Sequence, residues 1–143
     1  MKSYIIIFSL LLLAASLCSM APMDADQICG KWLNEEQNSQ IEIYKKGDQY
    51  FGKIVWVKEA KDPAGKPNTD QKNPEASLRD RPILGLEIIK DLTFAKGKWI
   101  NGTLYAQQAG LTMDCSLSLN ADDELEISVR KSFFSNTKVW TRL

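Results

Sequence analysis

Residues 49–58 have the sequence QYFGKIVWVK and carry the strongest strand signal in the chain. Six of the ten positions hold aromatic or β-branched residues, which favour strands because they pack well on a pleated surface. Just before them, residues 41–44 (IEIY) alternate with the period of two that a half-buried strand requires. A turn at 46–48 separates the segments, so we predict a hairpin of strands 41–45 and 49–58.

The same pattern of short strands and turns continues on both sides of this hairpin. Further strands are expected at 28–33, 86–94, 99–107, 112–119, 125–130 and 138–143. Asn101-Gly102 marks a tight turn or a bulge within one of them, and residues 120–123 form a hairpin turn. About eight short strands with little sign of a long helix favour an antiparallel barrel or sandwich. We predict an all-β, single antiparallel barrel, because closure leaves no bare sheet edge.

One long polar connection, residues 59–82, interrupts this pattern and contains four prolines. Loops of this length in a compact domain are uncommon and are often functional. Asn73 is expected to cap a short helical turn that has Pro74 at its first position and Glu75 in its first turn. Pro82 would then end that turn.

The N-terminus has the layout of a secretory signal peptide. Lys2 precedes an apolar run of about 13 residues at 5–17, short of the roughly 20 that span a bilayer. We predict a signal peptide at 1–21, a single domain at 22–143, no membrane span, and a periplasmic or secreted location. A retained anchor and lipidation at Cys18 are the alternatives.

The composition excludes several classes of function. The chain has 18 basic and 18 acidic residues and no histidine. Balanced charge gives no field that would attract nucleic acid, and the lack of histidine removes the usual general base and the commonest zinc ligand. We therefore predict no metal site, no cofactor and no nucleic-acid partner. An enzyme is the least favoured class, because it would need a carboxylate pair that the sequence does not identify.

Two cysteines, Cys29 and Cys115, follow the predicted signal peptide. An exported protein meets an oxidising compartment, where a disulfide between them would close a loop of about 86 residues. Two separate buried thiols are the alternative, and the sequence alone cannot place the two Cα atoms within reach of each other.

Two groups of residues are candidates for contact with a ligand. In the polar loop these are Asp70, Asn73, Arg79 and Arg81. The two arginines could form a fork for a carboxylate or phosphate, or they could pair with acidic residues of the loop and hold it in place. The aromatic candidates are Tyr50, Trp56, Trp99 and Tyr105. They either line a cavity or fill the core, since a barrel of about eight strands is packed or holds one small ligand.

A structural latch is expected where the barrel closes. First and last strands pair in a closed barrel, so an arginine near the C-terminus could stack on the indole of Trp32. Arg142 is the first choice for this arginine and Arg130 the second.

Six blocks in this order resemble an exported bacterial family called domain of unknown function 2147. They are Gly30-x-Trp32, Gly52-Lys53-Ile54-Val55-Trp56, Asp70-x-x-Asn73-Pro74, Leu78-Arg79-x-Arg81-Pro82-Ile83-Leu84-Gly85-Leu86, Trp99-x-x-Gly102-x-x-Tyr105 and Trp140-Thr141-Arg142. The resemblance implies a lipocalin-like (calycin-type) barrel in the bacterial envelope and no established reaction. The chain departs from the family pattern at 106–110, at Met113 and at 130–134.

Two functions follow as hypotheses. In the first, the barrel mouth binds a small, partly apolar or anionic molecule, with Tyr50, Trp56 and Tyr105 as walls and Arg79 and Arg81 holding an anionic head. In the second, the chain is an envelope protein-interaction module, an inhibitor or scaffold, that has a solid core and uses the polar loop for contact. The sequence leaves the oligomeric state open.

Overall fold

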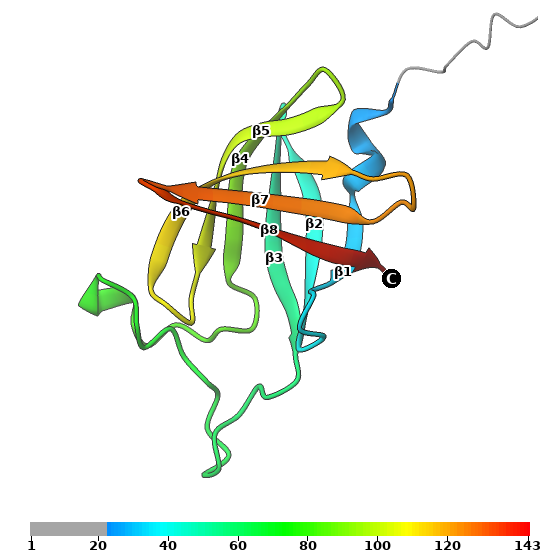
Figure 1. Cartoon of the computed structure of the whole chain (residues 1–143). Helices are drawn as coiled ribbons and strands as arrows, with labels where there is room; N and C mark the ends of the chain where they lie inside the picture. The colour runs from blue at the N-terminus through cyan, green and yellow to red at the C-terminus, as the bar shows by residue number, and fades with distance from the viewer. Residues whose placement is uncertain (1–22) are drawn as a thin grey trace, which may run out of the picture.

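The computed structural model of the chain describes residues 23–143. The predicted signal peptide at 1–21 and the candidate lipidation site Cys18 lie outside the described residues. Eight antiparallel strands close into one barrel, each pairing with the next in sequence (Figure 1). The strands are β1 (Gly30–Leu33), β2 (Ser39–Lys46), β3 (Gln49–Val57), β4 (Glu87–Ala95), β5 (Lys98–Ala106), β6 (Leu111–Leu119), β7 (Leu125–Lys131) and β8 (Phe134–Arg142). The predicted all-β barrel is therefore confirmed.

The first and last strands differ from their predicted bounds. β1 begins at Gly30, because the preceding residues form a 3₁₀ helix, η1 (Ala25–Ile28). β8 begins at Phe134 rather than at 138, and its first four residues are all exposed. A strand with no buried face has no apolar alternation, so this part of β8 gave no signal in the sequence.

The Asn101-Gly102 pair forms a bulge, not a turn. The register between β5 and β6 shifts between Trp99 and Gly102, and Asn101 has a φ of 61°. A Cβ on Gly102 would lie 2.6 Å from Cδ2 of Leu92 on β4. Glycine is required here because the neighbouring strand leaves no space for a side chain.

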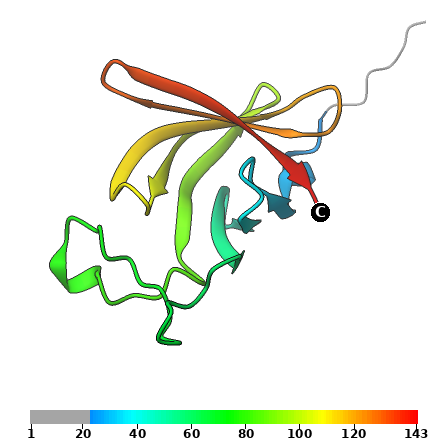
Figure 2. The same cartoon turned by 60° about the horizontal axis from the view of Figure 1, so that its bottom comes forward.

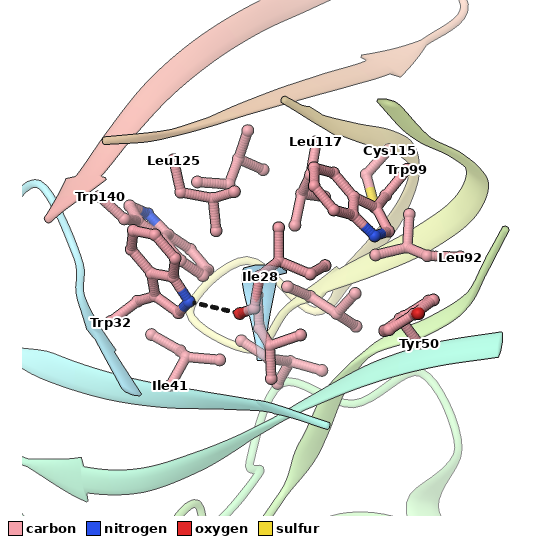
Figure 3. Packing of buried hydrophobic residues seen from close by; sticks show 14 of the residues in the cluster. Ile28, Trp32, Ile41, Tyr50, Leu92, Trp99, Cys115, Leu117, Leu125 and Trp140 are labelled. Carbon is pink, nitrogen blue, oxygen red and sulfur yellow. Dashed lines mark hydrogen bonds between the residues drawn. The ribbon is translucent and has the colours of Figure 1, made fainter. Parts of the chain in front are cut away.

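The helix η1 closes one end of the barrel. Ile28 is fully buried there, and its carbonyl accepts a 2.9 Å hydrogen bond from Nε1 of Trp32 (Figure 3). Nε1 of Trp99 donates in the same way to the carbonyl of Ala25, also at 2.9 Å. The hydroxyl of Tyr50 donates a 2.5 Å hydrogen bond to Asp26. Large aromatic side chains thus fill this end and satisfy their polar atoms on η1.

The barrel closes through a short seam between its first and last strands. Trp32 pairs with Arg142 and Leu33 with Thr141. The guanidinium carbon of Arg142 lies 4.3 Å from the centroid of the Trp32 ring. The same arginine donates a 2.8 Å hydrogen bond to Asp123. The structure thus brings together the two residues that were expected to form a latch.

The connection between β3 and β4 contains a helical turn, as predicted, but a smaller one. The 3₁₀ helix η2 (Ala76–Leu78) begins after Glu75, and no side chain caps it. Asn73 instead accepts a 2.9 Å hydrogen bond from the backbone N–H of Glu75, forming a local Asx turn ahead of the helix.

No helix within residues 23–143 is both long enough and apolar enough to cross a membrane.

Candidate functional site

The barrel has one open end. Because consecutive strands are antiparallel, the connections after β1, β3, β5 and β7 all lie at the same end, opposite η1. The long β3–β4 connection lies beside this end (Figure 2). We call this end the mouth.

A cavity of about 170 Å³ enters the barrel at the mouth and has an apolar floor. We call it the mouth cavity. Its apolar lining comes from inward positions of six strands, namely Ile41, Ile54, Ile88, Leu104, Ile127, Val129 and Trp140. Tyr105 and Ala106 also line it, and its polar edge consists of Asn34, Glu36, Ser39, Gln107, Gln108 and Lys138. An apolar interior with a few polar groups at the entrance is the usual make-up of a small-molecule site.

A second hollow of about 510 Å³, the rim groove, adjoins the mouth cavity. The two share five lining residues, which are Glu36, Ser39, Ile54, Gln107 and Gln108. The rim groove continues along the long loop, past Asn38, Val57, Lys58, Glu59, Asn68 and Ile83. A molecule could therefore lie with one part inside the barrel and the other under the loop.

The mouth carries charged side chains of both signs. Nζ of Lys138 donates a 2.6 Å hydrogen bond to Glu36 and lies 3.2 Å from Glu35. The bond from Lys138 holds the pKa of Glu36 below its ordinary value. The rim groove adds one base and one acid, Lys58 and Glu59. Its other added side chains are the amides of Asn38 and Asn68 and the apolar Val57 and Ile83. The charges of Lys138 and Glu36 at the mouth are thus paired with each other.

The long loop is held by a buried carboxylate, Asp70, which is fully buried. The hydroxyl of Tyr105 donates to it at 2.6 Å, Nδ2 of Asn73 at 2.8 Å, and Nη2 of Arg81 at 3.0 Å. We call these four residues the Asp70 anchor. Tyr105 belongs to β5 and the other three to the loop, so the anchor fastens the loop to the barrel wall.

The hydrogen bonds of the anchor shift the pKa values of its two acids in opposite directions. Burial alone would raise the pKa of Asp70, but hydrogen bonds from Tyr105, Asn73 and Arg81 outweigh it and keep that pKa below its ordinary value. Burial, followed by the nearby carboxylate, raises the pKa of Tyr105 to about 12. At neutral pH the carboxylate is charged and the phenol is protonated, so neither group is ready to exchange a proton.

Both arginines of the predicted anion fork face the loop itself. Nε of Arg79 donates a 2.7 Å hydrogen bond to the carbonyl of Asn73, and Arg81 pairs with Asp70. The sequence allowed these arginines either to bind an anion or to hold the loop. In the structure their side chains contact the loop and hold it.

The four aromatic candidates do not share one site. Tyr50 and Trp99 lie at the closed end, in contact with η1 (Figure 3). Trp56 is 40% exposed on the outside of β3. Only Tyr105 lines the mouth cavity. Tyr50 and Trp56 were predicted to form walls of the site, but aliphatic residues, including Ile54 of the same strand, line the mouth cavity instead.

Cys29 and Cys115 are both free thiols. Cys115, on β6, lies in the core of the barrel, and burial raises the pKa of its thiol to about 12. Burial also raises the pKa of Cys29, beside η1. The structure thus has two separate thiols, the second of the alternatives that the sequence left open. Across residues 23–143, no three His, Cys, Asp or Glu side chains gather as a metal site.

Comparison with known proteins agrees with this geometry. A family model described as "Uncharacterized protein conserved in bacteria (DUF2147)" matches residues 30–142. The chain belongs to this family. None of the curated proteins matches the chain. A similar solved structure is protein HP1028 from Helicobacter pylori, which is described as belonging to the lipocalin family. It has 21% identity and a TM-score of 0.69, over 81% of this chain and 82% of that one. The likeness shows a lipocalin-like fold.

The sequence blocks that resemble DUF2147 contain the whole Asp70 anchor. Asp70 and Asn73 come from one block, Arg81 from the next, and Tyr105 from the block that follows. In this DUF2147 protein, a physical role of those blocks is to hold the β3–β4 loop beside the mouth.

Sequence reasoning missed most of the mouth. Ile88, Leu104, Gln107 and Gln108 line it and were not candidates. The position of Leu104 could have been predicted. It is an inward residue near the end of β5, and this end of the strand lies at the mouth. The two glutamines belong to a turn, and turn residues have no periodicity that shows where they point.

Proposed function

We propose that this protein binds a small, mainly apolar molecule with an uncharged polar group, held at the mouth of the barrel. The observation that carries the proposal is the aliphatic mouth cavity, which opens into an amide-lined groove at the only open end of the described barrel. Lipocalin-like folds in general suggest small-molecule binding, which supports the proposal without naming a ligand.

The dimensions suggest how the ligand would lie. The mouth cavity of about 170 Å³ is smaller than the roughly 300–1,000 Å³ of a typical ligand site. It accommodates one apolar end, such as a short alkyl chain or a single ring. The remainder would lie in the rim groove, where Asn38, Asn68, Gln107 and Gln108 offer both donors and acceptors.

An anionic ligand fits less well than the sequence suggested. The guanidinium groups of Arg79 and Arg81 contact the loop, and the mouth base Lys138 is paired with Glu35 and Glu36. Binding an anion would require breaking one of these pairs, whereas a neutral amide or hydroxyl group would not.

We propose further that the protein acts outside the cytosol, on the basis of the predicted signal peptide at 1–21. Fractionation of cells that express the untagged full chain tests this, with N-terminal sequencing of the mature form. Recovery of the intact N-terminus in the cytosolic fraction would contradict it.

Ligand binding is tested by native mass spectrometry and by a neutral fluorophore. Protein purified from its own host should carry an adduct, and the apoprotein should increase the fluorescence of N-phenyl-1-naphthylamine. Leu104→Trp, which fills the mouth cavity, should abolish both signals. Leu84→Trp is the matched control, because Leu84 is 49% exposed outside the cavity. Bare protein mass together with no uptake of the dye, or unchanged signals in Leu104→Trp, would refute the proposal.

A second candidate, the protein-interaction module, is favoured by two exposed apolar side chains outside the barrel. Trp56 and Leu84 are 40% and 49% exposed, on the two segments that Ile54 joins by backbone hydrogen bonds to Gly85 and Leu86. If this surface binds an envelope protein, Trp56→Ser/Leu84→Ser should lose a crosslinked partner that Leu104→Trp retains. The reverse pattern would favour the small-molecule function.

A further inference from the structure

The tip of the β7–β8 hairpin exposes two adjacent phenylalanines. Phe133 is completely exposed and Phe134 is 55% exposed. The hairpin turns at Ser132 and Phe133, and Lys131 pairs with Phe134 across it. Hairpin turns usually hold glycine, asparagine or aspartate, so aromatic residues here call for an explanation.

This tip extends beyond the rest of the barrel. β7 pairs with β6 only as far as Arg130, and β8 pairs with β1 only at Thr141 and Arg142. The first four residues of β8, 134–137, are exposed on both faces. Figure 2 shows the hairpin turn standing clear of the neighbouring strands. Within residues 23–143 nothing covers Phe133, and more than half of Phe134 is exposed.

The charge around the tip is positive. Arg130 and Lys131 are exposed immediately before the turn, and residues 127–142 contain no acidic side chain. Two other bases of this stretch are occupied, since Lys138 pairs with Glu35 and Glu36 and Arg142 with Asp123. Arg130 lies opposite the exposed Asp114 of β6, and Nζ of Lys131 donates a 3.3 Å hydrogen bond to the carbonyl of Thr112, but neither base forms an ion pair within the described residues. An aromatic tip with two exposed bases beside it is complementary to an anionic lipid surface.

We propose that the β7–β8 hairpin docks the protein on an anionic lipid bilayer, with Phe133 and Phe134 inserted among the headgroups and Arg130 and Lys131 beside the lipid phosphates. Two phenylalanines offer about 300–500 Å² of surface, less than the roughly 800 Å² that each partner of a stable protein pair contributes. Insertion into a bilayer does not require such a minimum contact area. A second copy of the chain meets an electrostatic obstacle, because two identical basic tips repel each other.

Docking through this tip places the mouth toward the lipid. The β7–β8 turn is at the same end of the barrel as the other three connections around the opening, and Val129 and Lys138 of the hairpin line the mouth cavity. The inference does not depend on a cargo, and it holds for an empty barrel as well.

Vesicle flotation of the mature chain tests the proposal. The wild type should float with vesicles of phosphatidylcholine and phosphatidylglycerol and much less with phosphatidylcholine alone. Phe133→Ser/Phe134→Ser should reduce the bound fraction at least about tenfold, whereas Trp56→Ser/Leu84→Ser, the control for exposed apolar surface, should float like the wild type. Arg130→Gln/Lys131→Gln should also lose binding. Lys96→Gln/Lys98→Gln, which changes the turn at the closed end, should not.

Three results would overturn the proposal. They are a wild type that does not float, a tip variant that still floats, and binding that is independent of phosphatidylglycerol. A wild-type dimer that Phe133→Ser/Phe134→Ser converts to monomer, without any flotation, would assign the tip to a second copy instead. Dye uptake by the tip variants without vesicles keeps this test separate from the proposed function, and thermal unfolding verifies that they are folded.

Discussion

The hydroxyl of Tyr105 donates a 2.6 Å hydrogen bond to Asp70, and this bond joins strand β5 to the long β3–β4 loop. Tyr105 also lines the mouth cavity. One side chain therefore fixes the loop and forms part of the candidate binding surface. Loop position and the shape of the mouth are coupled through it.

Replacing Asp70 by asparagine should destabilise the protein by about 3 kcal/mol, the order expected when one partner of a buried pair is removed. Asn73 and Arg81 donate to one carboxylate oxygen and Tyr105 to the other, so an amide that keeps its oxygen on the first two directs its N–H toward the Tyr105 hydroxyl, which loses its acceptor, and the pair with Arg81 loses its charge. Urea unfolding measures the loss, and hydrogen exchange should show reduced protection at 68–83. Asp80→Asn is the control, since Asp80 is exposed in the same loop. Equal stability of the two variants would mean that the anchor contributes little.

Gly110→Ala should displace the loop from the mouth. A Cβ on Gly110 would overlap the backbone carbonyl of Lys72, two residues after Asp70. Gly47→Ala is a close control, because Gly47 has nearly the same φ, 63° against 64°, but open space around it. Both variants incur about 1–2 kcal/mol of backbone strain. Gly110→Ala should lose about 1–3 kcal/mol more through the clash and alter dye uptake at the mouth. Identical stabilities would show that the loop adjusts freely.

The seam between β1 and β8 should depend on the charge of Arg142. Arg142→Met keeps an unbranched apolar stem but removes the cation above Trp32 and the pair with Asp123. We expect a loss of about 1–2 kcal/mol in the free energy of unfolding. Arg130→Met, on the exposed face of β7, should change it by less than about 0.5 kcal/mol. If Arg142→Met and Arg130→Met have the same free energy of unfolding, the contact of Arg142 with Trp32 is not a latch.

The fold could be predicted because period-two alternation runs through most strands. Leu117, Leu125 and Ile127 point inward in the register that their spacing implies. The two failures have local causes. Ile28 is apolar and buried, as in a strand, but it belongs to η1. The start of β8 has no buried face at all.

The position of Trp56 shows why the site was harder to predict than the fold. Counting in twos from Tyr50 through Ile54 places Trp56 on the inner face. A bulge intervenes, since Ile41 pairs with Ile54 while its neighbour Gln40 pairs with Trp56. The extra residue, Val55, reverses the direction of Trp56 and sends it outward. A bulge of this kind depends on the partner strand, so the sequence of β3 alone does not reveal it.

Acid should release the loop before the barrel unfolds. Because the pKa of Asp70 is lower in the folded protein than its ordinary value of about 4, its stabilising effect is complete above that pH. The effect is lost as pH falls below about 4 through the lowered pKa, because the protonated carboxyl no longer pairs with Arg81. The difference in Tm between wild type and Asp70→Asn should therefore be constant at pH 5–7 and shrink below pH 4. This comparison removes the contributions of Glu36 and Asp123, whose pKa values are also lowered by their basic partners and which both proteins share. A Tm difference that stays unchanged down to pH 2 would show that Asp70 is not the group whose protonation frees the loop.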